Sequence, residues 1–129
     1  MGQSFDPNRY AVLVVEDDAL VRAEAADLCE DAGFTTYEAR NADQAIRMLE
    51  RHSDIRVLFT DIDMPGTMDG LKLAHAVRDR WPPVTIIVTS GRVQVTVDQM
   101  PVNSTFFTKP YPPRAILDML RDITLQLGG

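Results

Sequence analysis

Short runs of apolar residues alternate along the chain with longer stretches in which apolar and polar positions are mixed. Most of the short runs are apolar at consecutive positions and rich in β-branched residues, which predicts strands that are buried on both faces. Five strands are predicted, at Tyr10–Val15, Phe34–Ala39, Ile55–Thr60, Val84–Ser90 and Ser104–Thr108. The alternation of these strands with longer amphipathic stretches indicates an α/β fold with a parallel sheet.

Apolar residues recur at helical spacing in the longer stretches. Helices are predicted at Ala19–Ala32, Ala42–Arg51, about Asp69 to Trp81, and about Pro112 to Gln126. Asp18 and Asn41 are suitable N-caps, and Gly33 suits the position after a helix end. In the first helix, four apolar residues are expected to lie roughly on one face: Leu20, Ala23, Leu28 and Ala32.

The segment Gly91–Asn103 does not follow the helical pattern. Its valines at positions 93, 95 and 97 alternate with polar residues, and Pro101 would end a helix early. We therefore expect a short, irregular helix or a loop between the fourth and fifth strands.

Composition narrows the functional classes. A chain of 129 residues suffices for one domain, and a net charge of −6 argues against a nucleic-acid-binding face. One cysteine permits no disulfide within the chain, and no apolar run is long enough for a signal peptide or a membrane span. We expect a cytoplasmic protein with a polar, flexible leader at residues 1–9 and one domain at residues 10–127.

Polar and charged residues stand at the carboxyl ends of the predicted strands. These residues are Glu16 and Asp17 after the first strand, Asp61 after the third, Thr89 and Ser90 after the fourth, and Lys109 after the fifth. The carboxyl ends of parallel strands meet at one edge, where ligands bind in open sheets. Clustered carboxylates repel one another, and Mg²⁺ with its preference for oxygen ligands would relieve that repulsion. Together with a lysine and a hydroxyl, the set suits phosphoryl transfer to a carboxylate.

Four segments make the chain similar to the receiver domain of response regulators in two-component signalling. They are VLVVEDD (12–18), TDIDMPGTMDG (60–70), IIVTSG (86–91) and FFTKPY (106–111). The segments occur in the order of the family and close to its spacing, and the resemblance extends from about Tyr10 to Leu127. It implies a doubly wound, flavodoxin-like sheet of strand order 2-1-3-4-5. Helices one and five would cover one face, and helices two to four the other.

The resemblance implies a metal site and a reactive carboxylate. Asp61 would be the phosphoacceptor and a ligand of Mg²⁺, Asp17 would be the main carboxylate ligand, and Glu16 would contribute directly or through water. The backbone carbonyl of Asp63 would complete the protein ligands, and we expect the side chain of Asp63 to face solvent.

The resemblance also implies catalytic and switch residues. Lys109 would pair with the phosphoryl group, and Thr89 would bind one of its oxygens. Thr89 and Phe106 would form the switch, with Thr89 moving toward the phosphoryl group and Phe106 repacking into the space left behind. Because Phe106 and Phe107 are consecutive, we expect them to face opposite sides of the sheet.

The function implied by the family is that of a signalling receiver. The phosphoryl donor would be a phosphohistidine on a sensor histidine kinase or a histidine phosphotransfer protein. The only catalysis expected is the protein's own phosphorylation and dephosphorylation. We expect a monomer or weak dimer with an unknown output protein as partner, without nucleic acid, membrane or an output domain in this chain.

Two features depart from the usual family pattern. The loop MPGTMDG is about one residue longer than the commonest form, so backbone amides near Gly66 would lie differently over the phosphoryl group. The fourth helix is short and broken by proline, which affects the surface through which many receivers dimerise.

Two other interpretations remain open. An Asp-x-Asp sequence after an apolar strand also marks haloacid-dehalogenase-type phosphatases, in which Asp61 would be the nucleophile and Asp63 the general acid/base. Against this, Pro65 is unusual for those enzymes, their motif lies on the first strand, and the chain is short for that fold. The third possibility is a degenerate receiver that only binds partners, which the intact set of acids, hydroxyl and lysine argues against.

Overall fold

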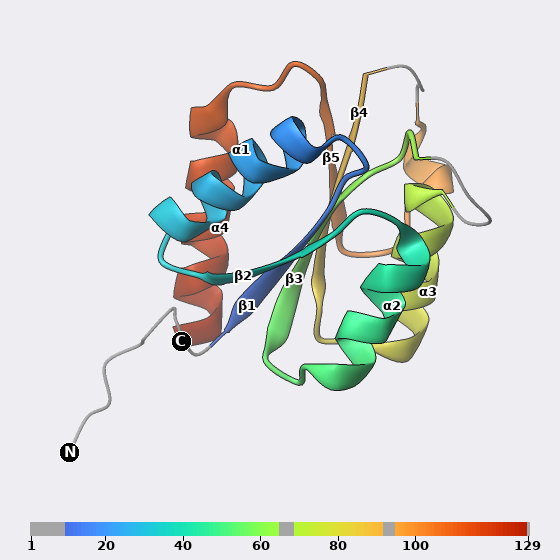
Figure 1. Cartoon of the computed structure of the whole chain (residues 1–129), viewed down its shortest axis with the longest axis horizontal. Coiled ribbons are helices and arrows are strands. Elements are labelled where there is room, and N and C mark those ends of the chain that lie inside the picture. Colours follow the sequence, from blue (N-terminus) through green and yellow to red (C-terminus); the bar gives the residue numbers. More distant parts are fainter. Residues whose placement is uncertain (1–9, 65–68, 92–94, 129) are drawn as a thin grey trace.

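The protein is built around one five-stranded parallel sheet (Figure 1). The structure is a computed structural model, and it describes residues 10–64, 69–91 and 95–128. The strands are β1 (Ala11–Val15), β2 (Thr35–Ala39), β3 (Ile55–Asp61), β4 (Thr85–Ser90) and β5 (Ser104–Thr108). Their spatial order is β2-β1-β3-β4-β5, and every neighbouring pair is parallel. The predicted fold class and strand order are confirmed.

The helices begin and end close to their predicted positions. They are α1 (Ala19–Asp31), α2 (Ala42–Arg51), α3 (Gly70–Arg80) and α4 (Pro113–Gly128). Asp18 accepts hydrogen bonds from the backbone N–H groups of Leu20 and Val21, and Asn41 accepts one from Gln44, so both predicted N-caps are confirmed. Gly33 follows α1 with a φ of 98°, a left-handed conformation that glycine adopts without strain.

Two apolar layers cover the two faces of the sheet. One layer packs Leu13, Leu58 and Ile86 against α2 and α3. The other packs Val12, Phe59 and Ile87 against α1 and α4. Figure 1 shows the two pairs of helices on opposite sides of the strands. The interior strands are buried on both faces, as expected for a parallel sheet between helices.

The inward face of α1 differs from the prediction. Ala25, Ala26 and Cys29 are its buried residues, whereas Leu20 is 70% exposed. Small side chains allow a helix to approach a sheet closely, so this helix packs mainly through two alanines and a cysteine, with Leu28 and Ala32 of the predicted face partly buried beside them. The expected role of Cys29 as a small apolar side chain is confirmed by its complete burial.

The connection between β4 and β5 is irregular, as predicted. In place of a full helix it contains the 3-10 helix η2 (Val97–Gln99). Side chains of α3 hold this connection: His75 Nε2 lies 2.7 Å from the Gln99 carbonyl oxygen, and Arg78 donates to the carbonyls of Val102 and Asn103. Arg78 thereby satisfies two backbone acceptors in the segment that leads into β5.

Two expectations fall outside the residues that the structure describes. The leader at residues 1–9 is one, and the loop around Gly66 in residues 65–68 is the other. Within the described ranges, none of the helices is long and apolar enough to cross a membrane.

Candidate functional site

The acids of the predicted site meet at the carboxyl ends of β1 and β3. One oxygen from each of Glu16, Asp17 and Asp61 lies within 4.8 Å of the others. Glu16 and Asp61 are 5% and 4% exposed, whereas Asp17 is exposed to solvent. These residues, with Asp63 and Lys109, line an open cleft of about 830 Å³.

Lys109 reaches the acids from the end of β5. Its Nζ donates a 2.8 Å hydrogen bond to Glu16 Oε1 and lies 3.2 Å from Asp61 Oδ1. The lysine is held in place because Lys109 N donates to the carbonyl oxygen of Ser90. One ammonium group therefore serves two buried carboxylates, which leaves the cluster with an excess of negative charge.

Burial and charge oppose each other in this cluster. Burial raises the pKa of the Asp61 carboxyl above its usual range, and the Lys109 ammonium offsets part of that rise. Burial likewise raises the pKa of Glu16, against the hydrogen bond from Lys109. Partial burial alone would lower the pKa of Lys109, but its contacts with Glu16 and Asp61 outweigh burial and raise it.

The residues present fit a divalent cation. Asp61 Oδ1 is buried, and the Lys109 ammonium that lies 3.2 Å from it already donates a hydrogen bond to Glu16. Buried carboxylates that share one ammonium are incompletely compensated, so additional positive charge beside them would be stabilising. Mg²⁺ prefers oxygen ligands and is usually held by one or two carboxylates together with waters and phosphate oxygens, which this set of acids can provide.

Local interactions fix the loop that carries Glu16 and Asp17. Arg22 of α1 donates to the Glu16 carbonyl oxygen at 2.9 Å and pairs with Glu38 at 3.2 Å. The backbone N–H of Asp18 donates to Glu16 Oε2. The sequence prediction did not include Arg22. The sequence signal that could have identified Arg22 is its position, because it lies in the first turns of a helix that starts directly after the two acids.

Thr89 and Phe106, the two residues expected to form the switch, lie on the neighbouring strands β4 and β5, where Phe106 is opposite Val88. Thr89 is buried and pairs with Asp61 in the register of β3 and β4. Phe106 packs against the apolar layer on the side of α2 and α3, and Phe107 packs against the opposite layer. The prediction that these two side chains face opposite sides of the sheet is confirmed.

The side chain of Asp63 does not point freely into solvent, which corrects the expectation for it. Asp63 Oδ2 accepts a 2.9 Å hydrogen bond from Ser90 Oγ and a 3.2 Å hydrogen bond from Gly91 N. The strand register explains this contact, because Asp61 pairs with Thr89 and Asp63 then lies level with Gly91. The hydrophobic periodicity of the sequence does not reveal which residues of neighbouring strands pair.

A close approach of the backbone at Gly70 shapes the same loop. A Cβ atom at Gly70 would lie 1.9 Å from the Asp61 carbonyl oxygen and 2.9 Å from Ile62 Cα. Gly70 N also donates to the Ile62 carbonyl oxygen. The first residue of α3 therefore contacts the backbone of the reactive strand, and a side chain there would push Asp61 out of position.

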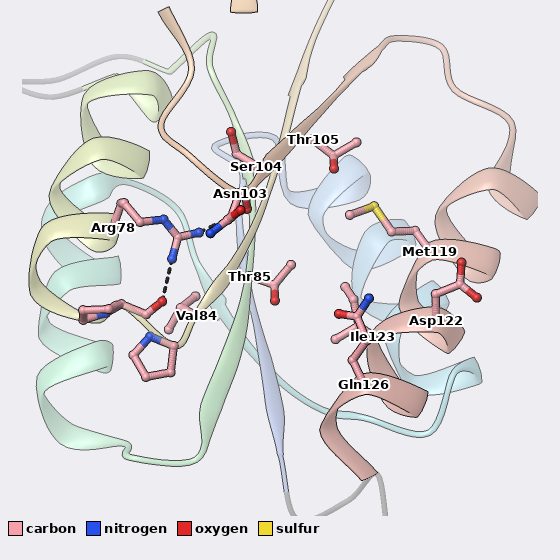
Figure 2. A pocket seen from close by; sticks show the side chains of 12 residues that line it. Arg78, Val84, Thr85, Asn103, Ser104, Thr105, Met119, Asp122, Ile123 and Gln126 are labelled. Atoms are coloured by element: carbon pink, nitrogen blue, oxygen red, sulfur yellow. Dashed lines mark hydrogen bonds between the residues drawn. The ribbon is translucent and has the colours of Figure 1, made fainter. Parts of the chain in front are cut away.

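A second cavity lies at the opposite ends of the strands (Figure 2). It has a volume of about 520 Å³ and is lined by residues of α3, β4, β5 and α4. Arg78, its basic residue, already donates to the carbonyls of Pro82, Val102 and Asn103. Its guanidinium is therefore engaged in holding the backbone, and the acids and the lysine of the strand ends do not line this cavity.

Comparisons with known proteins agree with the observed fold. Residues 12–121 match the family described as response regulator receiver domain. The chain is 33% identical over 122 residues to the response regulator protein FleR of Pseudomonas aeruginosa, covering 92% of this chain and 25% of FleR. It is 28% identical to a putative NtrX-like response regulator of Rickettsia bellii, covering 85% of this chain and 24% of that protein. The chain thus spans about a quarter of the length of these curated relatives.

Solved structures give the same result. A response regulator receiver protein from Pseudomonas putida superposes with a TM-score of 0.78 at 27% identity, over 88% of this chain and 97% of that one. A receiver protein from Sinorhizobium medicae reaches a TM-score of 0.81 at 24% identity, over 93% and 97% of the two chains, which supports the fold. The chain belongs to the response regulator receiver domain family of two-component signalling.

Proposed function

We propose that this domain, residues 10–127, accepts a phosphoryl group on Asp61 from a phosphohistidine. The donor would be a sensor histidine kinase or a histidine phosphotransfer protein. The observation that supports this most strongly is the placement of Asp61. Its buried carboxylate ends the central strand β3, with Lys109 Nζ at 3.2 Å and two further acids beside it.

Mg²⁺ would be held by Glu16, Asp17, Asp61 and the backbone carbonyl of Asp63. When bound, the ion would supply positive charge that offsets the charge on the phosphoryl oxygens. Asp17, being exposed, is open to act as the main carboxylate ligand. Glu16 is hydrogen-bonded to Lys109 and to the Asp18 backbone, which suits a weaker or water-mediated contribution.

In the transfer step, a carboxylate oxygen of Asp61 would lie in line with the P–N bond of the phosphohistidine. That oxygen forms a bond to phosphorus while the P–N bond breaks. The electron pair of that bond stays on the imidazole nitrogen, which then takes up a proton. Lys109 favours the ionised form of Asp61 before the step and pairs with the phosphoryl oxygens after it.

Phosphorylation would change the protein's contacts through Thr89 and Phe106. The acyl phosphate carries up to about two negative charges, and the Thr89 hydroxyl can donate to one of its oxygens. Thr89 is next to Asp61 in the sheet, and Phe106 lies on the neighbouring strand β5 opposite Val88, the residue before Thr89. Movement of Thr89 toward the phosphoryl group would be accompanied by repacking of Phe106. The output would be altered binding to a partner protein, with the receiver itself a monomer or weak dimer.

The geometry favours this function over a phosphatase. A general acid/base at Asp63 would need a carboxylate that is available to exchange protons with a substrate. Asp63 Oδ2 instead accepts two hydrogen bonds from the end of β4. Catalysis would then be limited to the protein's own phosphorylation and dephosphorylation.

Acetyl phosphate tests the proposal. We expect intact-mass spectrometry to show one added phosphoryl group in the presence of Mg²⁺, and none after chelation or in Asp61→Asn. The exposed acid Asp118 offers a matched control, and Asp118→Asn should be modified like the wild type. Full labelling of Asp61→Asn, or continuous turnover of a generic phosphate ester, would contradict the proposal.

A further inference from the structure

The carboxylate of Asp63 joins two segments that are far apart in sequence. Its Oδ2 atom accepts hydrogen bonds from Ser90 Oγ at 2.9 Å and from Gly91 N at 3.2 Å. Ser90 is the last residue of β4, directly after the proposed switch residue Thr89. Ser90 is also buried, so its hydroxyl is presented to Asp63 from a fixed position.

The backbone of the same residue faces the reactive carboxylate. The N–H group of Asp63 makes a hydrogen bond that favours the ionised form of Asp61. Its carbonyl is the proposed backbone ligand of the metal. The side chain of Asp63 is therefore placed to influence the orientation of both peptide groups, together with the 2.9 Å hydrogen bond from Met64 N to the Ile62 carbonyl oxygen.

The main chain contributes to the attachment to β4 at Ile62. Ile62 N donates to the Thr89 carbonyl oxygen at 2.8 Å, which extends the pairing of β3 with β4 by one residue. Beyond Ile62, the contacts of the Asp63 carboxylate continue the attachment to β4. Any movement of Ser90 and Gly91 is then transmitted to the peptide that binds the metal.

We propose that the Asp63 carboxylate is a positioning group that couples metal affinity at Asp61 to the conformation of the end of β4. The inference rests on the proposed function of the site. The intact contact would orient the Asp63 carbonyl for the metal, and loss of the contact would weaken metal binding. By thermodynamic reciprocity, bound metal would stabilise the contact to Ser90 and Gly91 to the same degree.

The hydrogen-bond geometry provides a test against a purely electrostatic role. Both donors contact a single oxygen, so an asparagine side chain can accept both bonds without carrying the charge. Asp63→Ala removes charge and acceptor together. If Asp63 acts through its charge, the two variants will behave alike; if it acts by positioning, Asp63→Asn will recover much of what Asp63→Ala loses.

Two measurements on the full chain decide the question. Mg²⁺ titration by calorimetry should show a several-fold weaker affinity for Asp63→Ala than for the wild type, largely restored in Asp63→Asn. Amide hydrogen exchange of Gly91 in the absence of metal should be about tenfold faster in Asp63→Ala and close to the wild-type rate in Asp63→Asn. Ser90→Ala, which removes a donor from the other side, should weaken Mg²⁺ binding in the same direction. Asp79→Ala removes an exposed acid of α3 and serves as the control for charge.

The outcomes separate this inference from the proposed function. A wild-type protein that binds no Mg²⁺ would overturn both. A wild type that binds Mg²⁺ together with an Asp63→Ala variant of unchanged affinity would overturn the coupling alone. The coupling would also be wrong if Asp63→Asn lost as much affinity as Asp63→Ala, or if Gly91 exchanged at the same rate in all variants.

Discussion

At the scale of single residues, the site is a balance between burial and compensating charge. Asp61 is nearly inaccessible, and the Lys109 ammonium that lies 3.2 Å from its Oδ1 is shared with Glu16. Such an arrangement is unfavourable for stability and is therefore typical of a functional site. A bound metal ion would supply further positive charge beside these carboxylates, and the phosphoryl group would provide a second partner for Lys109.

Sequence predicted these residues because each stands at the end of an apolar strand. It did not predict the contacts of Arg22 or Asp63, because both depend on how the strand ends and α1 meet in space. Arg22 reaches back to the Glu16 carbonyl, and Asp63 reaches across to β4. Side chains that bind backbone groups leave no periodic pattern in the sequence.

The thiol of Cys29 provides a prediction at this scale. Burial, with a smaller contribution from the charge of Glu30, raises the pKa of Cys29 to about 12. At pH 8 the folded protein should hold on the order of a thousandfold less thiolate than an exposed cysteine. We expect Ellman's reagent to label native protein far more slowly than protein in concentrated urea. Equal rates in the two conditions would show that the thiol is accessible in the folded protein.

At the scale of elements, α3 has two roles. Its first residue packs against the backbone of Asp61, and its last turns hold the connection between β4 and β5. The sequence correctly indicated that this connection is not a regular helix, since its valines alternate and Pro101 interrupts it. The sequence did not indicate what replaces the missing helix, because His75 and Arg78 lie on a different element and contact backbone carbonyls.

The inward face of α1 was predicted only in part. Periodicity selected Leu28 and Ala32, which pack at the margin of the core, and also Leu20 and Ala23, which are exposed. The buried residues of the helix are Ala25, Ala26 and Cys29. Helical spacing identifies apolar faces, but the distance between helix and sheet decides which face is buried. That distance depends on the partner strands, and the sequence of the helix alone carries no information about them.

Substitution of Arg78 tests the role of α3 in holding the connection. Arg78→Met keeps much of the aliphatic volume and removes the hydrogen bonds to three backbone carbonyls. We expect the free energy of unfolding in urea to fall by about 1–2 kcal/mol, a modest loss because the bonds are partly exposed to water. Hydrogen exchange should become faster at residues 96–103.

Arg47 on the exposed face of α2 supplies the matched control. Arg47→Met should change the free energy of unfolding by less than about 0.5 kcal/mol, as is usual for surface substitutions. Equal effects of the two substitutions would show that Arg78 is only a surface residue.

At the scale of the whole molecule, the parallel sheet brings four separate segments to one edge. The strand order places β3 at the centre, with β1 and β4 as its neighbours and β5 one strand further. The acids of β1, Asp61 of β3 and Lys109 of β5 meet only because of that order. Periodicity predicted the strands, and the family resemblance supplied their order, which no local pattern contains.

Mg²⁺ should stabilise the folded domain through this shared edge. The ion would bind the assembled acids and not the unfolded chain, so stability rises with its free concentration. At free Mg²⁺ about ten times the dissociation constant, we expect a gain of about 1.4 kcal/mol in the free energy of unfolding. Thermal unfolding with and without Mg²⁺ measures it.

Variants at Asp17 and Asp118 separate specific binding from a general salt effect. Asp17→Asn should lose most of the gain, and Asp118→Asn should keep it. A gain of the same size in both variants would show that the ion acts by screening the net charge and not by binding the acid cluster.

Chemical trapping tests directly whether Asp61 becomes an acyl phosphate. After reaction with acetyl phosphate and Mg²⁺, borohydride reduction converts a phosphorylated aspartate to homoserine, which tandem mass spectrometry locates in the chain. We expect homoserine at position 61 and at no other acidic position, and none when Mg²⁺ is chelated. Homoserine at position 17 or 63 with an unmodified Asp61 would contradict this expectation.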